Sequence, residues 1–165
     1  MTITAASATM TDWARRWDAA IPSAVLSGIN GDAAHQTDPG KHLSRSDNVQ
    51  RWGSSCWPVV HPKDKIGPSD KACAIDMNMN RADQNTVHNR FLNVYRNRAA
   101  DPRAQYVYAF NGWNGSGQPM RYNVANGATS VTDSSHTWHE HVETYYGYVN
   151  DPKMVDAMMS IIKGE

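Results

Sequence analysis

The chain has 165 residues, enough for one domain with a real hydrophobic core, so we expect a single domain that spans 1–165. Its 16 basic and 16 acidic residues balance, and no basic stripe indicates a nucleic-acid partner. No apolar run approaches the roughly 20 residues that cross a membrane, and the N-terminus has neither the charged nor the apolar segment of a secretory signal. We therefore expect a monomer that is made without a signal peptide and does not insert into a membrane.

The first third of the chain predicts one helix, one extended segment and a long loop. Thr11 or Asp12 can cap a helix that runs to about residue 20, and Pro22 ends or redirects it. Residues 23–29 predict a strand or an irregular packed segment. The polar stretch 33–71 is rich in proline and glycine, but its tryptophans argue against disorder. We interpret it as an ordered loop with little regular structure that lines a site.

The run 72–77 predicts a buried strand that is apolar on both faces except for Asp76. A carboxylate in such a run costs free energy unless it is paired or bound to a metal. Asp76 is therefore a candidate metal ligand, or alternatively it ends the strand and caps the next segment. Cys56 and Cys73 lack the spacing of a thiolate zinc site, and they either pair or remain thiols.

The second half of the chain predicts two helices and a hairpin. A helix begins within 83–85, and its periodicity places His88 on the surface. Residues 105–110 and 120–124 predict strands joined by a glycine-rich turn, and a final amphipathic helix follows Asp151. Together the elements predict an α+β fold. In it, a small antiparallel sheet carries the functional site and is flanked by helices and by a long ordered loop.

The stretch from His136 to Glu143 contains three of the seven histidines. Branched and aromatic residues make it a predicted strand, so His139, His141 and Glu143 share one face. Trp138 lies on the other face and is expected in the core. Two histidines two positions apart on a strand lie roughly 6.5 Å apart at Cα, close enough for their imidazoles to converge on one metal ion. The competing interpretation is an ordinary His-x-His pair on a polar surface strand.

The order of the histidine and aspartate motifs along the chain resembles that of the zinc peptidases of the D-alanyl-D-alanine carboxypeptidase class. The peptidase domains of actinobacteriophage lysins are the most similar members. The residues that carry the resemblance are Gly31-Asp32-Ala33-Ala34-His35, the downstream His42, Ala72-Cys73-Ala74-Ile75-Asp76, and His136-x-x-His139-x-His141. The resemblance covers most of the chain, from about residue 21 to residue 142. It implies the fold that these peptidases share with lysostaphin-like enzymes and the Hedgehog signalling domain.

Carried over residue by residue, the resemblance implies that His42, Asp76 and His141 bind a zinc ion. His139 would lie beside the metal and act on the water or on the transition state without binding the ion. His136 would orient His139 or hydrogen-bond the substrate, unless it is a surface histidine at the end of a loop.

The sequence also departs from the family pattern. His42 and Asp76 are 34 positions apart (76 − 42), much further than is usual in the family, which leaves His35 and His61 as rival first ligands. Many members use a glutamate near the last ligand as general base, whereas a histidine occupies that region here.

A residue ahead of the first ligand often holds the scissile carbonyl or a substrate carboxylate in the family. Gln36 is the candidate for that role in this chain, with Arg45 as the alternative on the other side of the ligand.

The resemblance implies a zinc-dependent peptidoglycan peptidase of the phage endolysin type, which hydrolyses a stem-peptide bond with a zinc-activated water. It would be made in the host cytoplasm and act on the bacterial cell wall, as an endopeptidase or as a D-Ala–D-Ala carboxypeptidase. Two imidazoles and one carboxylate leave one position of tetrahedral zinc open, which is typical of a catalytic site. The alternatives are a non-catalytic zinc-containing binding domain of the same fold and, with less support, a metal-dependent nuclease, against which the neutral charge argues.

Overall fold

The computed structural model describes residues 4–31, 35 and 37–165. These residues form an α+β fold around a six-stranded sheet in which every pair of neighbouring strands is antiparallel and the order is β1-β2-β6-β3-β4-β5. The strands are β1 (Val25–Gly28), β2 (Ala74–Asn78), β3 (Ala109–Gly112), β4 (Met120–Asn123), β5 (Thr129–Val131) and β6 (His139–Glu143). The α-helices are α1 (Ala8–Ala20), α2 (Arg45–Trp52), α3 (Arg81–Arg96) and α4 (Pro152–Lys163). The predicted α+β class with an antiparallel sheet is confirmed.

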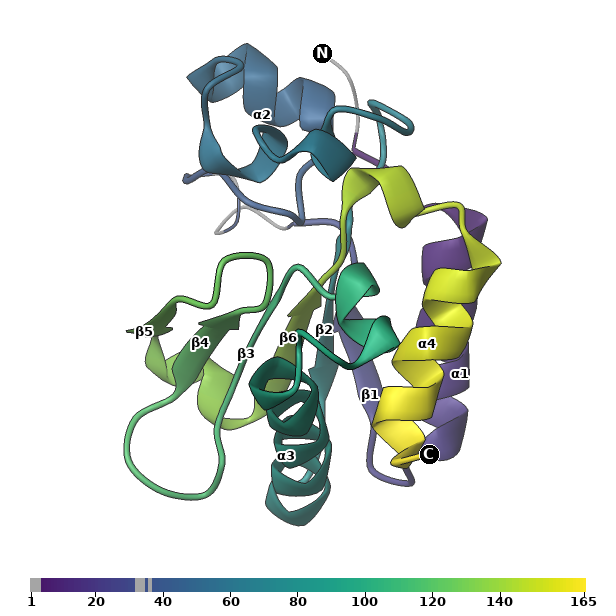
Figure 1. Cartoon of the computed structure of the whole chain (residues 1–165), viewed down its shortest axis with the longest axis vertical. Helices are drawn as coiled ribbons and strands as arrows, with labels where there is room; N and C mark the ends of the chain where they lie inside the picture. Colours follow the sequence, from purple (N-terminus) through teal and green to yellow (C-terminus); the bar gives the residue numbers. More distant parts are fainter. Residues whose placement is uncertain (1–3, 32–34, 36) are drawn as a thin grey trace.

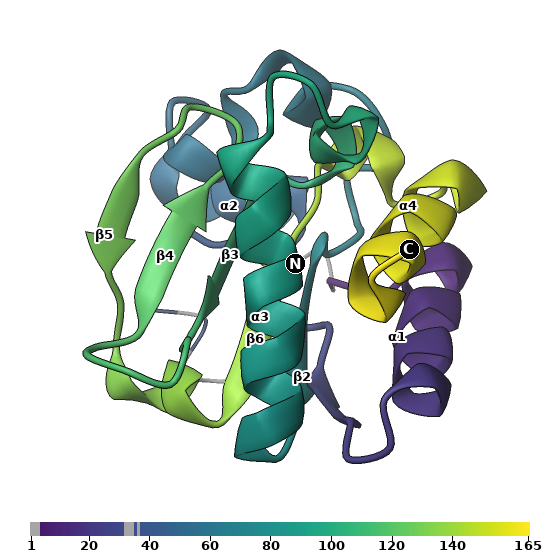
Figure 2. The ribbon, with the colours of Figure 1, turned by 60° about the horizontal axis from the view of Figure 1, so that its bottom comes forward.

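Three helices pack on one side of the sheet (Figures 1 and 2). α3 contacts β3, β4 and β6, while α1 contacts β1 and β2 and lies beside α4. α2 and the short turns around it form a separate cap at the top of Figure 1. Among the described residues, no helix combines the length and apolarity needed to span a membrane.

A single strand register gives the sheet one apolar and one polar face. Ile75, Val142 and Phe110 are direct neighbours on β2, β6 and β3, and all three are fully buried in the core. One position along each strand the side chains point the other way. There, Asp76 pairs with His141 and His141 pairs with Asn111 across the same strands. The central strands therefore place polar side chains in a row on the face away from α3.

The first helix begins earlier than its sequence suggests. Ser7 is the N-cap, and its hydroxyl accepts a hydrogen bond from the Met10 amide at 3.0 Å. The prediction of a cap at Thr11 or Asp12 was wrong, because a serine oxygen satisfies an unpaired helix amide as well as a carboxylate does.

The long segment 33–71 is more regular than predicted. It contains α2, which begins where the Ser44 hydroxyl accepts a hydrogen bond from the Asp47 amide at 3.1 Å. A fully buried ion pair joins two parts of the segment, with Lys41 Nζ 2.7 Å from Asp64 Oδ1. Asp64 Oδ1 also accepts a hydrogen bond from the Tyr146 amide at 2.9 Å, which ties the segment to the rest of the protein. The described part of this segment is therefore ordered, as expected, and contributes His35 and Trp57 to the lining of a cleft, but it was wrong to predict little regular structure in it.

The predicted strand at 105–110 is also displaced. Asp101 accepts a hydrogen bond from the Arg103 amide and, with a proline at the next position, begins a 3-10 turn over Pro102–Tyr106. Strand β3 therefore begins only at Ala109. The loop predicted before His136 contains an additional short edge strand, β5.

Candidate metal centre

Two contacts with backbone atoms fix the position of His42, one made by its own ring and one made by the preceding residue. Its Nδ1 lies 2.7 Å from the carbonyl oxygen of Ile29, and the carbonyl oxygen of the preceding Lys41 accepts a hydrogen bond from the Cys73 amide at 2.8 Å. Because a carbonyl oxygen only accepts, His42 Nδ1 must donate, and its Nε2 carries a lone pair. That nitrogen points at the β2 and β6 side chains.

Asp76 and His141 face each other from neighbouring strands in direct register. His141 Nδ1 lies 2.8 Å from Asp76 Oδ1, and His42 Nε2 lies 3.0 Å from Asp76 Oδ2. The two imidazole nitrogens are 3.1 Å apart. All three residues are at most 7 % exposed, so solvent barely screens the interactions among their side chains. The structure thus brings together the three predicted metal ligands.

The hydrogen bonds around the cluster direct the lone pairs of its neutral imidazoles inward. His141 Nε2 lies 2.9 Å from Glu143 Oε1, and a carboxylate accepts, so the neutral ring of His141 also presents a lone pair to Asp76. Three electron-pair donors therefore converge at short distance. Such a group needs positive charge between its members, which either a proton or a metal ion supplies.

The pKa shifts in the metal-free protein reflect the same need for positive charge. Burial alone would lower the pKa of His141, but Asp76 and Glu143 on either side raise it to about 9. Burial opposes ionisation of Asp76, yet the imidazoles of His141 and His42 hold its pKa far below the usual range. The centre therefore favours a cation.

The donor set fits zinc. Two donors about 2.0–2.1 Å from a tetrahedral zinc ion lie about 3.3 Å apart, slightly more than the separations seen here. A small outward shift of the three atoms would open space for the ion. Imidazole nitrogens with one carboxylate oxygen are a set that zinc accepts, although other divalent ions share this preference.

His35 adds a further donor instead of replacing His42. Candidate ligand atoms of His35, His42 and Asp76 all lie within 4.8 Å of one another, so this His-His-Asp cluster could hold a metal ion. The other rival, His61, is placed elsewhere: its ring packs on Tyr145 at 4.7 Å between centroids.

A second row of polar groups supports His141 from behind. Arg121 on β4 binds both oxygens of Glu143 at 2.8 Å, and Glu143 in turn accepts from His141. Arg121 also donates to Asn111 Oδ1 at 3.0 Å. Paired carboxylates that orient a ligating histidine commonly support metal sites. Sequence reasoning placed Glu143 on the correct face but missed Arg121 and Asn111, because only the pairing of β3 with β4 and β6 brings them there.

His139 and His136 lie next to the cluster, and their rings pack against each other at an angle of 42°. His139 Nε2 is 3.7 Å from Asp76 Oδ1, and the two rings are 4.6 Å apart at their centroids. Burial lowers the pKa of His139, and burial with the nearby His141 and His139 lowers the pKa of His136 to about 4. His136 is buried and within 3.2 Å of Asn111 Nδ2, so its interpretation as a surface histidine was wrong.

The cluster opens into a cleft of about 600 Å³. Its lining includes His35, His139 and Arg121, together with two tryptophans, Trp57 and Trp138. Trp138 is 55 % exposed, so its predicted place in the core was wrong. β6 begins only at His139, so strand alternation does not extend to Trp138, which ends the preceding 3-10 turn.

No match to this chain emerges from comparison with protein-family models, curated proteins and solved structures. The centre must be interpreted from its own geometry.

The two predicted substrate-binding residues receive no support from the structure. Gln36 lies outside the described residues. Arg45 begins α2, where its guanidinium donates to the carbonyl oxygens of Lys65 and Gly67, and it is not among the residues that line the cleft.

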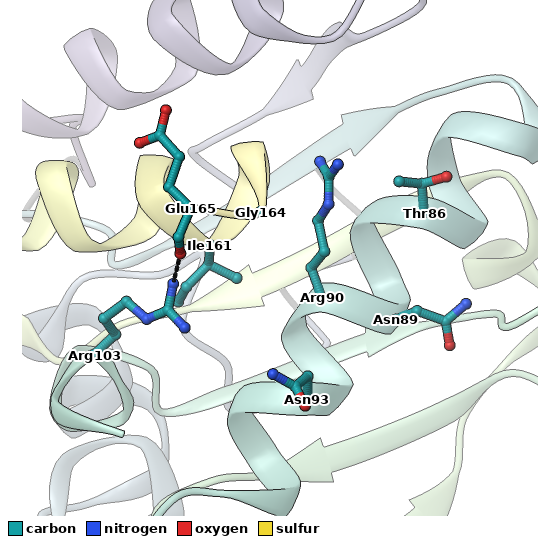
Figure 3. A pocket seen from close by; sticks show the side chains of 8 residues that line it. All are labelled: Thr86, Asn89, Arg90, Asn93, Arg103, Ile161, Gly164 and Glu165. Atoms are coloured by element: carbon teal, nitrogen blue, oxygen red, sulfur yellow. Dashed lines mark hydrogen bonds between the residues drawn. The ribbon is translucent and has the colours of Figure 1, made fainter. Parts of the chain in front are cut away.

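A second pocket, between α3 and the end of α4, has a structural explanation (Figure 3). Arg103 donates to the carbonyl oxygen of Glu165 at 2.6 Å, and Arg90 donates to that of Ile162. Positive side chains commonly satisfy the last carbonyls of a helix in this way. The guanidinium groups of Arg90 and Arg103 in this pocket therefore satisfy carbonyl oxygens at the C-terminal end of α4.

Proposed function

We propose that this chain is a zinc-dependent peptidoglycan peptidase of the phage endolysin type, with the fold shared by DD-peptidases and the Hedgehog signalling domain. The observation that carries the zinc site is the convergence of His42 Nε2, Asp76 and His141 Nδ1, each oriented by a hydrogen bond or strand pairing. The substrate class rests on the resemblance of the ordered motifs to that family.

The residues of the cleft divide into ligands and helpers. A zinc ion held by His42, Asp76 and His141 would acidify a water molecule and polarise a substrate carbonyl. His139 lies beside Asp76 with its ring at the cleft, where it can accept a proton from the attacking water and return it to the leaving amine. Asn111 holds His136 against His139 and so limits the rotation of both rings.

The surroundings of the centre support a role in binding an extended polar substrate. The cleft presents the indole rings of Trp57 and Trp138 together with the partly exposed Arg121, whose guanidinium lies 5.2 Å from the centre of the Trp57 ring. Aromatic faces bind the apolar surfaces of a peptide or sugar. Arg121, whose guanidinium is paired with Glu143, holds the wall of the cleft beside them.

Digestion of purified peptidoglycan tests this function. Mass spectrometry of the soluble products should show new peptide termini. Cleavage inside the stem peptide would identify an endopeptidase, and loss of a terminal D-Ala would identify a carboxypeptidase. A chelator should stop the reaction and added zinc should restore it. Asp76→Ala should be inactive, whereas Glu140→Gln, on the opposite face of the neighbouring strand β6, should remain active. A folded, zinc-loaded protein that produces no new termini would contradict the proposal.

A second candidate has one observation in its favour. If His35 joins the three ligands, the zinc ion has four protein donors, which is the arrangement of a structural site. The chain would then be a non-catalytic zinc-containing binding domain. Stoichiometric zinc without hydrolysis of peptidoglycan would support this alternative.

A further inference from the structure

Two imidazoles lie at the same distance from Asp76 but on different oxygens. His35 Nε2 is 3.7 Å from Oδ2, and His139 Nε2 is 3.7 Å from Oδ1. Each therefore lies just outside the three converging donors. Zinc with three protein ligands has one position left, and the distance alone does not decide which imidazole fills it.

The packing of the two rings distinguishes them. His35 packs edge-on against the ring of His42, with centroids 4.6 Å apart, and its donor belongs to the group that lies within 4.8 Å. The ring of His139 instead packs against His136 at 4.6 Å and Trp138 at 6.2 Å. His139 is thus engaged with the cleft wall, while His35 is engaged with a metal ligand.

The backbone near Gly31 keeps His35 close to the centre. The Gly31 amide donates to the carbonyl oxygen of His42 at 3.0 Å. A β-carbon on Gly31 would lie 2.7 Å from the β-carbon of His35 and 3.2 Å from that of His42. Only a residue without a side chain leaves room for both histidines, so this glycine permits their approach.

We propose that His35 is a fourth, displaceable zinc ligand that closes the centre in the resting protein. Its side chain is 41 % exposed and lines the cleft, whereas those of His42, Asp76 and His141 are at most 9 % exposed, so His35 is the donor that a molecule in the cleft reaches most readily. This inference rests on the proposed zinc site. With His35 bound, the metal centre has no open position. It opens only when a substrate in the cleft displaces the imidazole of His35.

The experiment compares His35→Ala with His139→Ala, the variant that removes the equidistant imidazole. The zinc Kd is measured by competition with a chromophoric chelator, and the visible absorption of the cobalt-substituted proteins reports the donors around the metal. Even an outer partner of a ligand typically contributes 10–100-fold to metal affinity, so His35→Ala should weaken zinc binding about tenfold or more. Its cobalt spectrum should lose one nitrogen donor, whereas His139→Ala should keep the wild-type Kd and spectrum.

Gly31→Ala is a second variant, which removes no candidate ligand side chain. It should weaken zinc binding chiefly by displacing His35, because the added β-carbon would lie 2.7 Å from the β-carbon of His35 and 3.2 Å from that of His42. Combining it with His35→Ala should therefore add less than the sum of the two separate losses.

The possible failures are distinguishable. If His35→Ala keeps the wild-type zinc Kd and cobalt spectrum, or if only His139→Ala changes them, His35 is not a fourth ligand. The proposed function would still stand. A wild-type protein that binds no zinc would overturn both.

Discussion

Strand β6 carries a histidine–carboxylate pair on each of its faces, and only one of them belongs to a candidate functional site. On the cleft face, His141 Nδ1 lies 2.8 Å from Asp76. On the opposite face, His88 Nδ1 from α3 lies 2.9 Å from Glu140 Oε1. The two separations are nearly equal, so the contact itself does not separate a functional centre from a structural one.

The difference lies in what surrounds each pair. The His88–Glu140 pair is at most 1 % exposed, and His88 packs on the rings of Phe110 and Tyr122. A β-carbon on Gly112 would lie 1.9 Å from Glu140 Oε2, so this glycine makes room for the carboxylate. The pair is therefore sealed in the core.

The cleft pair, in contrast, has further nitrogen donors and a route to solvent. His42 and His35 reach the other oxygen of Asp76, and the cleft opens beside them. A buried histidine–carboxylate pair can thus form part of a functional site only when further lone pairs converge on it and a substrate can reach it.

The largest expected effect comes from breaking the cleft pair. His141→Ala removes one ligand and leaves Asp76 and His42 with one fewer partner, so we expect stoichiometric zinc and peptidoglycan hydrolysis to be lost together. Metal analysis after dialysis and the digestion assay measure the two effects. His88→Ala is the matched control, and zinc loss in that variant as well would remove the distinction between the faces.

Breaking the sealed pair should affect stability and leave the metal in place. Glu140→Ala leaves the fully buried His88 without its carboxylate, and removing one partner of a buried pair typically costs about 3–5 kcal/mol. Urea unfolding of the metal-free protein should show this loss, while the folded variant keeps its zinc. A decrease in unfolding free energy below about 1 kcal/mol would show that the pair is not a structural anchor.

A smaller effect should follow from weakening the support of His141. Glu143→Gln keeps the shape but removes the charge that holds His141 Nε2–H and Arg121. We expect zinc affinity to fall about 10–100-fold, measured by chelator competition, because outer partners set ligand orientation and basicity. Unchanged affinity would mean that strand pairing alone orients the ring.

The smallest expected effect is at the rim of the cleft. Trp138→Ala removes an exposed side chain, so the unfolding free energy should change by less than about 0.5 kcal/mol, while KM for peptidoglycan fragments rises. Trp113→Ala is the control, because Trp113 packs on Arg81 and is not among the residues that line the cleft. Equal changes in KM for both variants would exclude a specific role for Trp138.

The sequence pointed to both members of the cleft pair. A lone carboxylate in an apolar strand and a His-x-His strand are each weak patterns alone, and their order along the chain and its resemblance to a known family predicted that they share one site. The pairing of Asp76 with His141 brings them together. Arg121 and Asn111 were beyond the reach of such patterns, because a hairpin with an irregular loop does not reveal its register.

The sealed pair could have been found but was missed. His88 was predicted on the surface, yet it lies on the buried stripe of α3 with Gln84, Val87 and Phe91, at the spacing of one helix face. The polar character of two members obscured that stripe. Glu140 was hidden for a similar reason, since a carboxylate on the core face of a strand is expected only when its partner is known.

The central claim is that a metal ion occupies the cleft face of β6 and not the sealed face. A crystal of the zinc-loaded protein, measured at the zinc absorption edge, tests it most directly. The account predicts a single strong anomalous peak bounded by His42, Asp76 and His141, with no peak beside His88 and Glu140. The absence of a peak in the cleft, or a peak at a different group of residues, would contradict it.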